Sequence, residues 1–183
     1  MLLSRPSKPG LGYLSKGERI KGILCMVTKI EIRRATADDL NSVTLLNQKL
    51  FQFDAKFHQT LDHGFPLSAV GQQYFLSRVS GHSGVGFIAE INGIIVGYLV
   101  GAILEAPAYR SFKKLGELEN MFVEVEARGK GVGRQLVSKF FDWCKQEGVS
   151  NIRVVATAQN ETALEFYRRL GFADSTVTLE HKF

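Results

Sequence analysis

The dipeptide Asn92-Gly93 constrains the fold of this chain more than any other feature of its sequence. It separates two apolar runs, residues 86–90 and 94–103. An Asn-Gly pair favours the two-residue turn that joins antiparallel strands, because both of its residues tolerate the left-handed backbone that this turn requires. We therefore predict an antiparallel pair of strands in the middle of the chain.

Periodic patterns place further strands and helices around this pair. Alternation of apolar and polar residues, or a run of β-branched residues, predicts strands at 29–33, 116–124, 151–156 and 175–180. Apolar residues at helical spacing predict helices from a cap at Thr36 to about residue 51, over 69–79, from 132 to a stop at Gly148, and from a cap at Asn160 to a stop at Gly171. This order of elements predicts an α/β protein with a mixed sheet.

The length and composition of the chain fit one domain of ordinary size. With 183 residues, of which 45% are hydrophobic, the chain can bury a core of its own. Its two cysteines, Cys25 and Cys144, lie far apart and outside any Cys/His cluster, so we expect neither a disulfide framework nor a metal site. No apolar run reaches the length of a membrane span, and the first residues lack the apolar segment of a secretory signal. We expect a cytoplasmic protein without a membrane partner.

The positive charge is concentrated in the first 25 residues. This segment holds five of the 23 Lys and Arg residues but one of the 18 Asp and Glu residues, so the remainder is close to neutral despite a net charge of +5. A neutral body argues against a nucleic-acid partner, and we expect none. Because the segment is rich in Gly and Pro and lacks periodicity, we interpret residues 1–25 as a flexible basic extension and residues 26–183 as the domain. The alternatives are that Met26 is the natural start, or that the segment is a short targeting tail.

Residues 127–134, ARGKGVGR, hold three glycines and three cations between a predicted strand and a predicted helix. Alternating glycines let the backbone turn tightly and expose its amides, and cations beside free amides at a helix start suit a phosphate group. A P-loop is excluded because Gly131 stands where Ser or Thr must follow Lys130. A dinucleotide fingerprint is excluded because Arg134 stands where its third glycine belongs. The remaining pattern, Arg-x-x-Gly-x-Gly, predicts a loop that binds a pyrophosphate.

Residues 123–136, VEVEARGKGVGRQL, resemble the acetyl-CoA signature of the GCN5-related N-acetyltransferase (GNAT) superfamily, whose core is Gln/Arg-x-x-Gly-x-Gly/Ala. Residues 160–172, NETALEFYRRLGF, resemble the second motif of that superfamily. The two motifs come in the order of the family with one predicted strand between them, and the resemblance extends from about Ile30 to the C-terminus. It implies the GNAT fold, a mixed and mostly antiparallel central sheet flanked by helices, and by analogy a homodimer.

The resemblance also implies how acetyl-CoA would be held as a co-substrate. The backbone of Phe122 and Val123 would pair with the pantetheine arm as an added strand. Asn160 would contact the same molecule, and Tyr167 would lie near its sulfur. The pyrophosphate would be held by the side chains of Arg128 and Arg134 and by the loop amides, which belong to Gly129, Lys130, Gly131, Val132, Gly133 and Arg134.

The implied reaction is direct attack of a primary amine on the thioester. Roughly one amine in a thousand is uncharged at neutral pH, so a base or a water chain must first take a proton. Glu119 is our candidate base, with Glu117 and water as alternatives. Tyr167 is our candidate acid for the departing thiolate, and the alternative is a packed core aromatic. Alternation along the predicted strand separates two groups of side chains: Glu119, Met121 and Val123 on one face, and Leu118, Asn120 and Phe122 on the other.

The sequence constrains the acceptor amine less closely. The acceptor would enter between residues 51–83 and 105–115, which hold the acidic Asp54, Asp62 and Glu105 together with several cations. The Leu-Glu-Asn stretch at 118–120 resembles polyamine-type members of the family, so a small amine or polyamine is our first hypothesis. The alternatives are a protein N-terminus or lysine, an aminoglycoside, and a non-catalytic protein that senses acyl-CoA.

Overall fold

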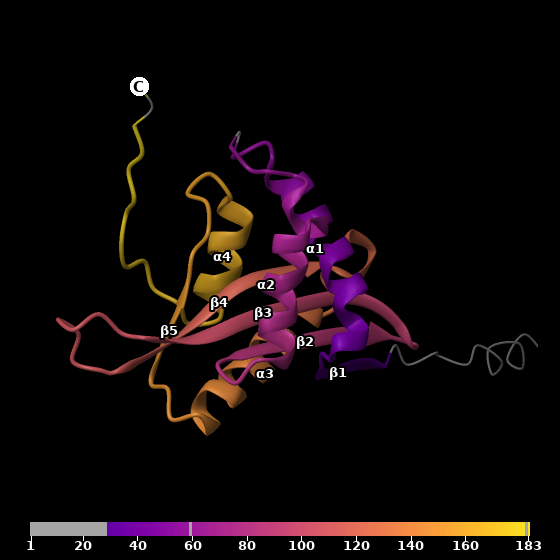
Figure 1. The fold of residues 1–183 in the computed structure, drawn as a ribbon, viewed down its shortest axis with the longest axis horizontal. Coiled ribbons are helices and arrows are strands. Elements are labelled where there is room, and N and C mark those ends of the chain that lie inside the picture. The colour runs from indigo at the N-terminus through magenta and orange to yellow at the C-terminus, as the bar shows by residue number, and fades with distance from the viewer. Residues whose placement is uncertain (1–28, 59, 182) are drawn as a thin grey trace, which may run out of the picture.

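The computed structural model describes residues 29–58, 60–181 and 183. The predicted extension, residues 1–25, and the alternatives for it lie outside the described residues. Strands β1 to β4 are antiparallel to their neighbours, whereas β5 runs parallel to β4, so the predicted mixed and mostly antiparallel sheet is confirmed (Figure 1). The five strands form one sheet in chain order: β1 (Ile30–Arg34), β2 (Gly84–Ile91), β3 (Ile94–Glu105), β4 (Lys114–Val123) and β5 (Asn151–Val154).

The turn between β2 and β3 forms at the predicted dipeptide. Asn92 has a φ of 53° and Gly93 a φ of 79°, the left-handed values that a primed two-residue turn uses. The register pairs Ile91 with Ile94 across it. The predicted hairpin is therefore confirmed.

Four helices flank the sheet, each where the sequence predicts one. α1 and α2 cover one face of the sheet, and α3 covers the other (Figure 1). Tyr98 and Phe75 are buried in the core on the α1/α2 side, and Leu99 and Phe140 are buried in the core on the α3 side. The helices are α1 (Leu40–Asp54), α2 (Ala69–Ser80), α3 (Val132–Gln146) and α4 (Glu161–Arg169).

β4 contains a bulge at Glu119. In the register with β3, Val100 pairs with Asn120 and Gly101 pairs with Leu118, so Glu119 is the extra residue. An extra residue shifts all later side chains of a strand to the opposite faces.

The predicted faces of β4 are wrong because of this bulge. Leu118 packs on the α3 side, whereas Asn120 and Phe122 lie on the α1/α2 side. Glu119 lies on that side too, and Met121 packs on the α3 side. Simple alternation assumes one residue per step of the ladder, and a bulge breaks that assumption.

β4 and β5 separate halfway along β4. They pair over Leu115–Leu118 and Asn151–Val154, and β4 then continues to Val123. No described residue pairs with β4 on that side beyond Leu118. This leaves an open strand edge beside the start of α3.

The predicted strand at 175–180 is not formed. Residues 173–181 have no regular secondary structure, and the side chains of Val177 and Leu179 are 83% and 91% exposed. Alternating β-branched residues favour an extended chain, but a strand also needs a neighbour for its backbone hydrogen bonds. No described strand pairs with this segment.

Candidate active site

The glycine loop between β4 and α3 exposes the first amides of α3. Gly129 and Gly131 have φ values of 74° and 86°, and a Cβ on either residue would point into open space. Gln135 donates its amide to Gly131 O at 3.1 Å, and the amides before it have no partner inside the helix. The side chains of Lys130 and Arg134 are exposed beside these amides. The loop thus has the donors and the charge that a phosphate group requires.

The third glycine of the loop has a different role. Gly133 lies in the first turn of α3, where a Cβ would be 3.2 Å from the ring of Phe166 on α4. This close approach packs α4 against the start of α3. The two sequence motifs are therefore neighbours in space.

Arg128 is held at the end of β4. Its Nε donates to Val123 O at 2.9 Å. Its guanidinium lies 5.2 Å from the ring centre of Phe53 on α1 and 5.3 Å from that of Phe122 on β4. Arg128 therefore joins the end of α1 to the open edge of β4.

The backbone of β4 faces two directions at this edge. Glu124 N donates to Val96 O of β3 at 2.8 Å, so strand alternation turns the backbone groups of Phe122 toward β3 and those of Val123 away from it. Of the two residues predicted to pair with a pantetheine arm, Val123 thus faces the open edge and Phe122 faces β3. The ring of Phe122 is buried in the core on the α1/α2 side.

Tyr167 and Asn160 lie on α4, the helix beside the loop. Tyr167 is 9% exposed and packs against Phe172, with 5.6 Å between ring centres. Burial, and after it the negative charge of Asp54, raises the pKa of the Tyr167 hydroxyl far above its usual range, so the phenol stays protonated at neutral pH. Asn160 Oδ1 accepts from the Ala163 amide at 3.2 Å and caps α4, so its side-chain NH2 is the group that a ligand would meet.

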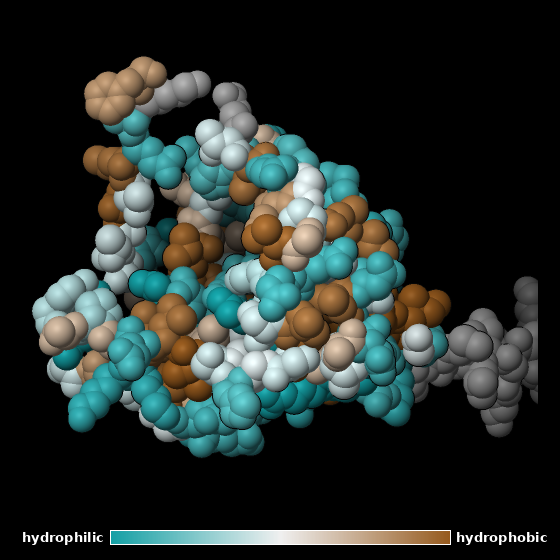
Figure 2. Space-filling model, viewed as in Figure 1, coloured by the Kyte–Doolittle hydropathy of each residue, from teal (hydrophilic) through white to brown (hydrophobic). Residues whose placement is uncertain are grey.

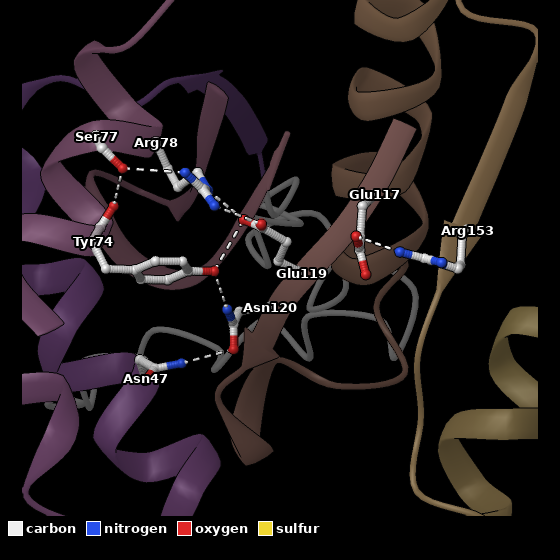
Figure 3. A network of polar contacts seen from close by, with 8 residues as sticks. All are labelled: Asn47, Tyr74, Ser77, Arg78, Glu117, Glu119, Asn120 and Arg153. Atoms are coloured by element: carbon white, nitrogen blue, oxygen red, sulfur yellow. Dashed lines mark hydrogen bonds and ion pairs between the residues drawn. The ribbon is translucent and has the colours of Figure 1, made fainter. Parts of the chain in front are cut away.

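Glu119 is bound from two sides by residues of α2 (Figure 3). Arg78 donates to it through Nε at 2.6 Å and through Nη2 at 2.8 Å, and the Tyr74 hydroxyl donates at 2.9 Å. Asn120 donates to the same Tyr74 hydroxyl at 3.0 Å, and Asn47 of α1 donates to Asn120 at 3.2 Å. Glu119 Oε2 therefore uses both of its lone pairs, and Oε1 uses one.

Glu117, the alternative base, is also in an ion pair. Arg153 of β5 donates through Nη2 to Glu117 Oε2 at 2.8 Å. Figure 3 shows this side chain directed toward β5, away from the network around Glu119.

Asp54, the last residue of α1, has a different environment. Its Oδ1 is buried without a hydrogen-bond partner among the described residues, and burial raises the pKa of its carboxyl. The sequence places Asp54 only within a broad acidic region. A more specific signal is its spacing from Asn47, because residues seven apart share one face of a helix, and this face is mostly apolar.

The surface is hollowed between α4 and the pair α1 and α2 (Figure 2). The open edge of β4 lies beneath this region in the same view (Figure 1). Within the described residues, no three His, Cys, Asp or Glu side chains gather as a metal site would need. None of the described helices combines the length and the apolar character of a membrane span.

Comparisons with known proteins identify relatives of this chain among N-acetyltransferases. A relative from Methanocaldococcus jannaschii, described as an uncharacterized N-acetyltransferase, is 26% identical over 152 residues. The match covers 83% of this chain and 64% of the relative, so this chain spans slightly less than two thirds of the relative's length.

Solved structures share the fold. A protein from Clostridium acetobutylicum described as a predicted acetyltransferase, solved with acetyl-CoA, has a TM-score of 0.67 at 22% identity over 84% of this chain and 96% of that one. An aminoglycoside N-acetyltransferase, solved with CoA, has a TM-score of 0.68 at 16% identity over 85% of this chain and 95% of that one.

The sequence itself matches the model of the acetyltransferase (GNAT) family over residues 49–172, which is more than half of the chain. The match includes both motifs, the bulged strand β4 and the helix that carries Tyr167. The chain therefore belongs to the acetyltransferase (GNAT) family, whose enzymes use acetyl-CoA as the acyl donor.

Proposed function

We propose that this protein transfers the acetyl group of acetyl-CoA by direct attack to the primary amine of a small molecule or polyamine. The observation that carries the proposal is the open edge of β4 between the glycine loop and Tyr167. An open strand edge can pair with the extended pantetheine arm, and the loop amides can donate hydrogen bonds to the pyrophosphate. A protonated phenol can donate a proton to the departing sulfur. These three requirements of acetyl-CoA chemistry meet in one region of the molecule.

In this proposal the loop and β4 share the binding of acetyl-CoA. The amides of residues 129–134, with the side chains of Lys130 and Arg134, hold the pyrophosphate. Val123 pairs with the pantetheine arm, and the side-chain NH2 of Asn160 contacts the same molecule. Arg128 supports the site indirectly, because its hydrogen bond to Val123 O keeps the end of β4 in place.

Bound acetyl-CoA supplies an activated thioester, so the protein has to position the amine and move protons. Positioning two reactants is worth several kcal/mol of the barrier, about 7 to 11 kcal/mol in the most favourable cases. We assign Tyr167 as the proton donor for the departing sulfur, because a phenol is protonated at neutral pH and Tyr167 lies on α4, the helix beside the glycine loop.

The ion pairs around β4 bear on the choice of base. Glu119 can take a proton only through its one remaining lone pair, or after breaking a hydrogen bond with Arg78 or Tyr74. Glu117 is engaged with Arg153 and points toward β5. We therefore propose that Glu119 fixes Arg78 and Tyr74 as one wall of the acceptor site, and that another group takes the proton.

A small acceptor is supported by the polar groups that line this wall. Asn120 keeps one side-chain N–H beyond its bond to the Tyr74 hydroxyl, and Asp54 keeps an unpartnered oxygen, so both suit an acceptor that carries several amino or hydroxyl groups. One structurally similar protein is, by its name, an aminoglycoside acetyltransferase, which supports the same class of acceptor.

A thiol-release assay tests this function on the full chain with acetyl-CoA. The panel contains diamines, polyamines, aminoglycosides and short peptides with a free N-terminus or lysine. We expect at least a tenfold higher kcat/KM for one of the small amines than for any peptide, about 1.4 kcal/mol of transition-state discrimination. A preference for peptides would support the protein-modifying alternative, and binding of acetyl-CoA without turnover would support a sensor.

A further inference from the structure

α1 carries two polar side chains with unpartnered atoms on one face. Asn47 is completely buried, and its Nδ2 donates to the Tyr98 hydroxyl at 2.7 Å and to Asn120 at 3.2 Å. Its Oδ1 has no partner among the described residues, and neither has Asp54 Oδ1. Seven residues are nearly two full turns, so Asp54 continues the line of Asn47 about 10 Å further along the helix.

This line on α1 leads from the core to the proposed reaction centre. Asn47 fixes its inner end on β3 and β4 through Tyr98 and Asn120. Arg128, stacked on Phe53, fixes its outer end beside the open edge of β4. Burial raises the pKa values of Tyr98 on β3 and Tyr167 on α4, and the charge of Asp54 adds a smaller increase to each.

Asp54 also lacks the ion pairs that hold Glu117 and Glu119. The ammonium of Lys56 lies 4.1 Å from the ring centre of Phe53 and 4.7 Å from that of Phe57. Lys56 and His58 favour the charged form of Asp54, but burial outweighs both and raises its pKa. The buried Oδ1 of Asp54 lacks a hydrogen-bond donor among the described residues, and an ammonium group supplies the donor that it lacks.

We propose that Asp54 binds the ammonium group of the acceptor and is the first acceptor of its proton. The inference rests on the function proposed above and names the chemistry of the acceptor at this site, a primary ammonium group. The proposal gives the three carboxylates separate roles. Glu117 binds Arg153 of β5, Glu119 binds Arg78 of α2, and Asp54 binds the acceptor.

The proton and electron balance is complete without a further reactant. The ammonium group gives one proton to Asp54, and the freed lone pair forms a bond to the thioester carbonyl carbon. The carbon–sulfur bond breaks with its electron pair on sulfur, which takes a proton from Tyr167. The second proton leaving the nitrogen restores Tyr167, and Asp54 releases the first to solvent, so the products are an amide, a thiol and one proton.

The test compares Asp54→Asn with the unsubstituted chain, with spermidine as the acceptor, at pH 7 and pH 9. We expect kcat/KM to fall about 100-fold at pH 7, and by only a few-fold at pH 9, where free amine is more abundant. Asp54→Glu keeps a carboxylate and should recover part of the activity. Activity of Asp54→Asn within twofold of the unsubstituted chain at both pH values would overturn the proposal.

Two control variants separate the effect of Asp54 from that of removing any one carboxylate. The titratable groups around Asp54 are Lys56 and His58 on the same segment, Tyr98 on β3 and Tyr167 on α4. Asp38→Asn makes the same chemical change at an exposed position before α1, and Asp142→Asn makes it at an exposed position on α3; both should keep the pH dependence of the unsubstituted chain. If either control reproduces the effect of Asp54→Asn, the proposal is overturned.

A titration of acetyl-CoA keeps this inference distinct from the function on which it rests. Asp54→Asn should bind acetyl-CoA within twofold of the unsubstituted chain, because the loop and the β4 edge are unchanged. Normal acetyl-CoA binding with unaffected turnover overturns the role of Asp54 alone. Absence of acetyl-CoA binding to the unsubstituted chain overturns the proposed function and this inference with it.

Discussion

At the scale of single residues, the glycine loop uses glycine for two purposes. Gly129 and Gly131 adopt positive φ with open space around them, so their freedom shapes the backbone for a ligand. Gly133 is needed because a side chain there would meet Phe166 of α4. We propose that the same residue type serves binding at two positions, whereas at the third it allows packing.

Gly131→Glu is expected to abolish tight binding of acetyl-CoA. It adds bulk and negative charge where we propose the pyrophosphate lies, so we expect at least a tenfold increase in Kd, about 1.4 kcal/mol, by calorimetric titration. Gly148→Glu is the matched control, because Gly148 also has a positive φ, 73°, and open space but follows the other end of α3. Both variants should lose about 1 kcal/mol of stability. Equal affinity in both variants would contradict the assigned pyrophosphate site.

Tyr167→Phe is expected to lower kcat about 100-fold and to leave the affinity for acetyl-CoA unchanged, because it removes the proton donor and keeps the ring. Steady-state kinetics and a direct titration measure the two effects separately. Tyr109→Phe removes the same hydroxyl from a side chain that is 82% exposed and should change neither. An unchanged kcat for Tyr167→Phe at every pH would make Tyr167 a packing residue.

At the scale of elements, an ion pair fixes the start of α1. Arg33 of β1 donates through Nη1 and Nη2 to the two oxygens of Asp39, each at 2.7 Å, and the Thr36 amide donates to Asp39 at 2.9 Å. The pair joins β1 to the helix that carries Asn47 and Asp54. It therefore sets the position from which α1 reaches the site.

The stability of this junction should depend on pH. The hydrogen bonds from Arg33 lower the pKa of Asp39 from 3.8 to about 2, so its contribution to folding is complete above about pH 4 and is lost as the pH falls toward 2. We expect Asp39→Asn to reduce the free energy of unfolding by about 2 kcal/mol at pH 7 and by little near pH 2. Denaturant unfolding at both pH values measures the difference, and Asp38→Asn should show no such dependence. An equal loss at both pH values would contradict the role of the charge.

The sequence predicts the described helices and strands well because the residues that begin and end them act on their near neighbours in the chain. Caps and turn residues such as Thr36, Asn92 and Gly148 act within a few positions of themselves. The bulge at Glu119 depends on packing instead: a Cβ on Gly101, near it on β3, would lie 2.5 Å from the ring of Phe140. The strand predicted at 175–180 fails for a related reason, because its pairing partner is not encoded in its own pattern.

The candidate site likewise has a part that local sequence predicts and a part that depends on packing. The glycine loop can be read from the sequence, since its spacing and charge lie within eight residues. The ion pair of Glu119 with Arg78 joins residues 41 positions apart, and no local pattern predicts it. The burial of Asp54 Oδ1 without a partner likewise follows from how α1 packs on the sheet.

At the scale of the whole molecule, the sheet separates two functions. We propose that the loop, the start of α3 and the outer edge of β4 bind acetyl-CoA, and that α1 and α2 on the other face bind the acceptor. β4 belongs to both parts, because its bulge presents Glu119 to α2 while its open edge faces the loop. In this proposal the amine and the thioester meet where β4 leaves β5.

Direct transfer is the central claim, and mass spectrometry of one reaction mixture tests it most directly. The full chain is mixed with acetyl-CoA and spermidine, and the masses of both spermidine and the protein are followed over time. We expect acetylated spermidine to accumulate with free CoA while the mass of the protein stays unchanged. Bound acetyl-CoA with no acetylated amine, or an acetyl group found on the protein as an intermediate, would contradict direct transfer.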